Sequence, residues 1–192
     1  PATPQTASLA APSAPSAEAW QLASGYPLKN SKRYRHTWAQ LVRSRMGTAY
    51  AGPEQGQVRL RVTLAPDGRV EKAEELWSTS ATASRLAQAA IRNLPPTPPT
   101  PTGEPLVFET TISFLPFETG WPPGYQRDCE PDAPVFRNPY AWKGGTTPPT
   151  AIAPPPAMDE TSVSPECESG EESLDEAASD LKRQMEIQRW GR

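Results

Sequence analysis

The stretch QVRLRVTL at residues 57–64, followed directly by APDG at residues 65–68, decides the fold of this chain. Aliphatic side chains stand at every second position of the first stretch, with Gln, Arg and Thr between them. This alternation puts the aliphatic side chains on one face and predicts a half-buried antiparallel strand. In the second stretch Pro presets φ, Asp bonds its own backbone and Gly accepts a positive φ, which predicts a tight turn.

A hairpin partner is therefore expected at residues 69–77. Its apolar positions change phase across Glu71 and Lys72, as a β-bulge would cause. The turn and the two strands together predict a β-hairpin.

A helix is predicted on each side of this hairpin. Apolar residues recur at helical spacing over residues 31–45, and Gly47 follows as a stop signal. The Ser/Thr cluster at residues 78–82 suits a helix N-cap, and the apolar stripe after it ends where Pro95 begins. Both helices are expected to pack one face against the sheet.

The run PPTPPTP at residues 95–101 predicts an extended, polyproline-like crossing to a third strand at residues 107–114. The order helix, hairpin, helix, crossing and strand predicts an α+β fold over residues 26–117. Its small three-stranded antiparallel sheet carries two helices on one face. Sequential pairing places the strand at residues 57–64 in the centre and the last strand at an edge.

The remaining residues are predicted to lie outside this domain, because the chain has 25 Pro and only 36% apolar residues. Residues 1–25 are a linker rich in Pro, Ala and Ser, and residues 118–170 are an extended tail rich in Pro and acidic groups. Residues 171–192 predict an amphipathic C-terminal helix with acidic side chains early and basic ones late.

Cys129 and Cys167 both fall in the Pro-rich tail, where no core is expected to bury them. Two interpretations remain open. A disulfide between them would place the protein in an oxidising compartment, whereas two unpaired surface thiols would not.

Several functions are disfavoured by composition. The single histidine, His36, has no evident carboxylate or cysteine partner, and no spacing matches a metal or cofactor site. We therefore expect no enzyme activity, no metal and no cofactor. The net charge of -3 and the solvent side predicted for the basic residues of the first helix argue against nucleic-acid binding. No apolar run is long enough to span a bilayer, so membrane association would need an upstream segment.

Four motifs in this order resemble the C-terminal domains of the TonB/TolA family: YP at residues 26–27, GQVRLRV at 56–62, PDGRV at 66–70 and LAQAAI at 86–91. The Pro-rich crossing and the strand at residues 107–114 complete the similarity. The resemblance implies a periplasmic module that binds partner proteins of the cell envelope, in some cases by pairing a partner segment with a sheet edge. Under this interpretation the partner-binding residues are Tyr26, Pro27, Thr110, Thr111, Ile112, Ser113 and Phe114.

Three functional classes follow from these observations. The first is a TonB/TolA-like module that couples an upstream membrane helix to an outer-membrane or periplasmic partner. The second is a structural or accessory subunit of a cell-envelope assembly, which needs no such helix and no energy coupling. The third is an adaptor whose Pro-rich runs bind SH3-like domains, and the absence of basic residues close to those runs disfavours it.

Overall fold

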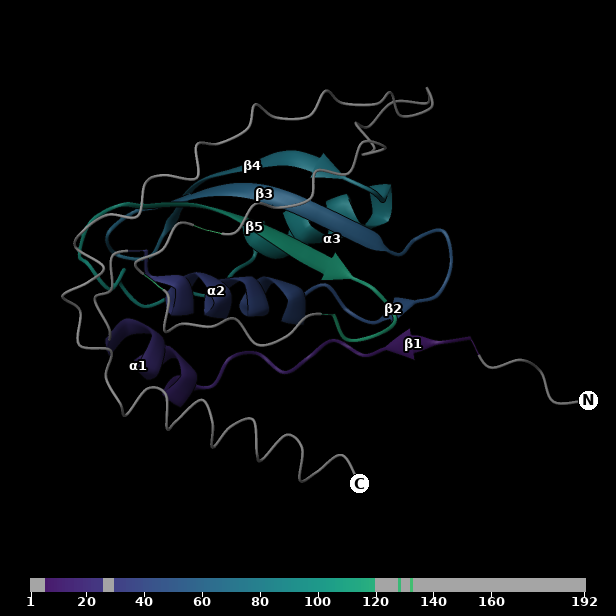
Figure 1. Cartoon of the computed structure of the whole chain (residues 1–192), viewed down its shortest axis with the longest axis horizontal. Helices are drawn as coiled ribbons and strands as arrows, with labels where there is room; N and C mark the ends of the chain where they lie inside the picture. The colour runs from purple at the N-terminus through teal and green to yellow at the C-terminus, as the bar shows by residue number, and fades with distance from the viewer. Residues whose placement is uncertain (1–5, 26–29, 120–127, 129–131, 133–192) are drawn as a thin grey trace, which may run out of the picture.

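The computed structural model describes residues 6–25, 30–119, 128 and 132. Within these residues the fold is α+β, with helices packed beneath an antiparallel sheet (Figure 1). The elements in chain order are β1 (Ser8–Leu9), α1 (Ala17–Gly25), α2 (Lys32–Ser44), β2 (Ala49–Tyr50), β3 (Gly56–Leu64), β4 (Val70–Ser78), α3 (Ala81–Arg92) and β5 (Leu106–Phe114).

The main sheet has the strand order β4-β3-β5, and both pairings are antiparallel. Its centre is β3, in which every second residue is buried and the residues between are partly buried or exposed, which agrees with the half-buried strand that the sequence predicts. The hairpin prediction is also confirmed, since Gly68 N–H donates to the carbonyl of Ala65 across the turn. The pairing of β3 with β4 shifts register twice, and one shift falls where Val70 and Lys72 flank Glu71. The expected bulge is therefore present at that position.

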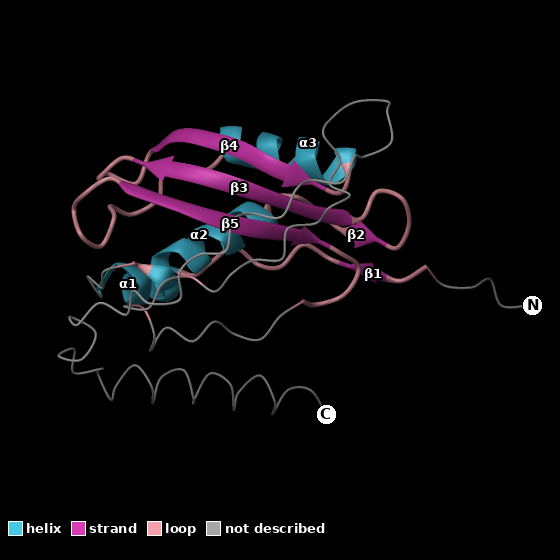
Figure 2. Ribbon diagram, turned by 45° about the horizontal axis from the view of Figure 1, so that its top comes forward, coloured by secondary structure: helices cyan, strands magenta, loops and turns pink. Residues whose placement is uncertain are grey.

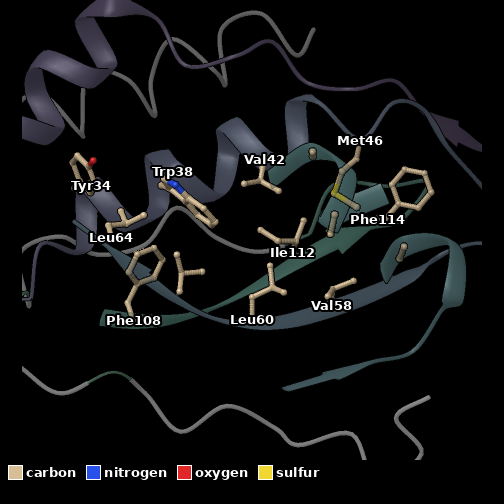
Figure 3. Close-up of a cluster of buried hydrophobic side chains, with 14 of the residues drawn as sticks. Tyr34, Trp38, Val42, Met46, Val58, Leu60, Leu64, Phe108, Ile112 and Phe114 are labelled. Atoms are coloured by element: carbon tan, nitrogen blue, oxygen red, sulfur yellow. The ribbon is translucent and has the colours of Figure 1, made fainter. Parts of the chain in front are cut away.

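Both α2 and α3 cover the same face of the sheet, which confirms the predicted architecture. Helix α3 packs against β3 and β4, while α2 packs against β5 (Figure 2). Ser80 is the N-cap of α3, and its hydroxyl accepts the N–H of Ala83 at 3.2 Å. The buried cluster between the layers includes Trp38 and Val42 of α2 with Leu60 of β3 and Phe108 of β5 (Figure 3).

The proline-rich crossing is fixed to the hairpin turn by hydrogen bonds. Thr100 N–H donates to the carbonyl of Pro66 at 2.9 Å, and the Thr97 hydroxyl donates to the carbonyl of Gly68 at 2.7 Å. From the core, the hydroxyl of Tyr34 donates to the carbonyl of Pro98 at 2.6 Å. Burial raises the pKa of this fully buried tyrosine, so it stays a neutral donor.

The N-terminal residues differ from the sequence-based prediction of a linker over residues 1–25. Strand β1 pairs with β2, and α1 packs on α2, where Ala23 is buried. The ring of Trp20 meets Tyr34 edge-on, with 5.4 Å between the ring centroids. Average composition does not reveal α1, because it hides the single large side chain of Trp20, whose partial burial against the core helps to offset the ordering of a short helix.

Other predictions concern residues outside the described ranges. These are the positions Tyr26 and Pro27, the Cys129 to Cys167 disulfide, the extended tail over most of residues 118–170 and the helix at residues 171–192.

Candidate protein-binding edge

Strand β5 forms one edge of the sheet, as predicted. In the part of the chain that the structure describes, it pairs with β3 and with no other strand. Its pairing with β3 runs without a register shift from Leu106 to Phe114. A regular, nine-residue edge strand of this kind is suited to accept a further strand.

The backbone groups of β5 that face the open side follow from the pairing of β3. Thr79 N–H donates to the Gln57 carbonyl at 3.0 Å, and Ala65 N–H donates to the Arg69 carbonyl at 2.8 Å, so odd-numbered residues of β3 turn their backbone groups toward β4. Because these groups alternate along a strand, the even-numbered residues of β3 bond to β5.

The register then assigns the two sides of β5. Its even-numbered residues pair with the even-numbered residues of β3. The N–H and C=O groups of the odd-numbered residues therefore point away from the sheet. Those residues are Val107, Glu109, Thr111 and Ser113.

The predicted partner-binding residues on β5 divide between its two faces. Thr111 and Ser113 lie on the face opposite the helices, where they pair with Arg59 and Gln57. On the helix side, Ile112 and Phe114 are buried and Thr110 is partly buried. Only the backbone and the outer side chains of this strand can therefore meet a partner, because the buried side chains on the helix side belong to the core.

A charged network covers the outer face beside this edge. Arg59 donates to the Thr111 hydroxyl at 3.0 Å and to Glu109 at 3.1 Å, and Arg61 donates to the other oxygen of Glu109 at 2.9 Å. Burial raises the pKa of Glu109, but the hydrogen bonds and charges of the two arginines outweigh it, so the pKa lies below its ordinary value. The carboxylate is ionised at neutral pH, and the cluster keeps one excess positive charge.

Helix α2 adds a second basic surface along β5, which we call the arginine flank: Arg35, Ala39 and Arg43. The Arg35 guanidinium carbon lies 6.0 Å from the centroid of the Phe108 ring, and that of Arg43 lies 5.1 Å from the centroid of Phe114. The two rings stand near opposite ends of β5, so the flank follows the strand along most of its length. The sequence predicts that these arginines face solvent, and their aromatic neighbours come from tertiary packing.

Two aspartates from beyond β5 return to the first turns of α2. The Asp128 carboxylate accepts the N–H groups of Asn30 at 2.8 Å and Lys32 at 2.6 Å, and the Asn30 side chain donates to its carbonyl. Asp132 accepts both terminal nitrogens of Arg35, at 2.7 and 2.9 Å. Hydrogen bonding from Arg35 holds the pKa of Asp132 below its ordinary value. Neither residue was predicted, because each acts on a helix almost a hundred positions earlier.

Comparison with protein-family models, with curated proteins and with solved structures finds no match to this chain. Within the described residues, each helix is too short or too polar to span a lipid bilayer. The same ranges hold no group of three or more His, Cys, Asp or Glu side chains placed to bind a metal ion.

Proposed function

We propose that this chain is a non-catalytic protein-binding module of the cell envelope, working in the periplasm. It pairs the open side of β5 with an extended segment of a periplasmic or outer-membrane protein, in the manner that its resemblance to TonB/TolA C-terminal domains implies. Main-chain hydrogen bonds supply affinity in such a complex, and neighbouring side chains supply selectivity.

One observation carries this proposal: β5 is a regular edge strand whose odd-numbered residues direct their backbone groups away from β3. Val107 is also 61% exposed at one end of that edge. An edge strand that is neither short nor bulged can pair with a further strand.

The test uses two substitutions at one position, Thr111→Pro and Thr111→Ala. Both remove the hydroxyl that accepts from Arg59. Only proline removes the outward N–H, and proline is tolerated on the open side of an edge strand. We expect Thr111→Ala to retain envelope partners in a quantitative pull-down from envelope extract, and Thr111→Pro to lose them while keeping a folded circular-dichroism spectrum.

A photo-crosslinking side chain at Val107 provides an independent measurement. Tyr50 is a suitable control site, because it is 56% exposed but belongs to β2 instead of β5. Crosslinks to an envelope protein should form from position 107 and be absent from position 50. Equal capture by the two Thr111 variants, together with equal crosslinking at both sites, would exclude the edge as the contact.

A further inference from the structure

The arginine flank keeps hydrogen-bonding capacity that its present contacts do not use. Nε of Arg35 and Nη2 of Arg43 are buried, and neither has a hydrogen-bond acceptor among the described residues. The other terminal nitrogen of Arg43 donates to the carbonyl of Gly47 at 2.8 Å. A buried guanidinium N–H without an acceptor is costly, and a carboxylate is the group whose geometry best satisfies it.

The chain itself demonstrates that a carboxylate binds this flank. Asp132 holds Arg35 through two parallel hydrogen bonds, although its own side chain remains 53% exposed. The Arg35 side chain is only 12% exposed, so the carboxylate side of this contact is the part that reaches the surface. Arg43 has no ion-pair partner within the described ranges.

The position of the flank relates it to the edge of β5. Helix α2 packs against β5, and the two run in the same direction, since Arg35 meets Phe108 and Arg43 meets Phe114. A strand added to the open side of β5 would project every second side chain toward the helix layer. Those side chains would stand over the arginine flank.

The distance between Arg35 and Arg43 determines which positions of an added strand could carry acidic residues that reach both of them. They are two helical turns apart, which is about 12 Å along the helix axis. Residues four apart in a strand are about 13 Å apart and point to the same side. Two acidic side chains at that separation would match the two guanidinium groups, with a small or apolar side chain over Ala39 between them.

On the basis of the proposed edge contact, we propose that the partner segment is acidic: an extended strand with two Asp or Glu residues four positions apart. One pairs with Arg43, and the other replaces Asp132 on Arg35. The excess positive charge of the cluster of Arg59, Arg61 and Glu109 on the other face of β5 adds to the attraction.

A random library of displayed nine-residue peptides can test this proposal while the partner itself is still unidentified. The library is selected on the full chain, and clones are kept if they bind Thr111→Ala but not Thr111→Pro. We expect these clones to share two acidic positions four residues apart. Exchange of either acid for its amide should weaken binding about tenfold, the effect of losing one charge-assisted hydrogen-bonded pair.

Variants of the chain complete the test. Arg43→Gln should abolish the preference at one acidic position only, while Arg45→Gln, an exposed neighbour outside the flank, should change nothing. Asp132→Asn should strengthen binding several-fold, because the resident competitor for Arg35 is removed. Clones that bind Thr111→Ala but not Thr111→Pro, and that show no acidic preference, would overturn this inference and leave the edge contact standing. A selection in which no clone distinguishes Thr111→Ala from Thr111→Pro would overturn both.

Discussion

At Gly68 the hairpin turn approaches the proline-rich crossing so closely that no side chain fits between them. Its φ is +89°, and a Cβ atom there would lie 2.4 Å from the carbonyl oxygen of Pro98 and 2.6 Å from that of Thr97. Two independent constraints, one conformational and one steric, therefore require glycine at this position.

Gly68→Ala should destabilise the fold by more than about 2 kcal/mol, because the crossing must move and its hydrogen bonds to the turn must weaken. Gly103→Ala is the matched control: its φ is also positive, at +72°, but nothing lies within 4 Å of the added Cβ. That variant should lose only about 1 kcal/mol. Urea unfolding of both proteins measures the difference, and equal losses would show that close approach is unimportant.

Asp128 is the second single residue with a large expected effect. Ser31, the N-cap of α2, has a positive φ and makes no side-chain capping bond, so the Asp128 carboxylate supplies that function from another part of the chain. Asp128→Ala should lower the free energy of unfolding by about 1–2 kcal/mol, the usual worth of a helix cap. Glu54→Ala removes an exposed carboxylate in the loop before β3 and is the control in thermal unfolding. It should change stability by less than about 0.5 kcal/mol.

At the scale of elements, the ion pair between Arg35 and Asp132 ties α2 to the chain after β5. Because the folded pKa of Asp132 is lowered, its contribution is fully present above the unfolded pKa and disappears as pH falls through the folded value. We expect Asp132→Asn to have a lower free energy of unfolding than the natural chain above about pH 5. This difference in free energy should shrink as the pH falls below about 4. The gap should be under about 1 kcal/mol, since the pair is partly exposed.

Unfolding curves collected across this pH range measure the gap directly. Glu109 also has a lowered pKa, so both proteins should lose stability in acid. A gap that stays constant down to about pH 3 would mean that Asp132 does not act through its charge.

Helices and strands with a clear periodic pattern of apolar residues could be predicted from the sequence. Elements that form only through tertiary contacts could not. The alternation in β3 and the apolar stripes of α2 and α3 each specify one buried face, so their positions agree with the structure within a residue or two. In contrast, β1 and β2 have two residues each, too few to display any period.

The candidate site, too, could be predicted only in part. Its edge position follows from pairing order, which the sequence reveals through the hairpin and the single long crossing. The arginine flank depends on which side of α2 lies beside β5, and Asp132 depends on a return of the chain that leaves no local pattern. Tertiary contacts of this kind carry no periodic signal.

At the scale of the whole molecule, the folded unit is larger than the segment predicted from sequence. The piece covering residues 26–117 lacks α1, whose Trp20 packs on Tyr34, and lacks the capping carboxylate of Asp128. It should still unfold cooperatively, but at a lower urea concentration than the piece covering residues 6–132. The free energy of unfolding should differ by about 2 kcal/mol, the combined effect of one partly buried aromatic side chain and one cap. Identical midpoints would show that neither the N-terminal elements nor the Asp128 cap adds stability.

The pairing of β1 with β2 has a mechanical consequence. A pull on the N-terminal end reaches this pair before it reaches the sheet, and the pair has only two residues on each strand. It should yield at low force, freeing β1 and residues 10–16 as slack of about 3.4 Å per residue. Tension would then pass to α1, while the register of β5 stays intact. Opening of this short pair would therefore lengthen the N-terminal segment under load and leave the pairing of β5 with β3 unchanged.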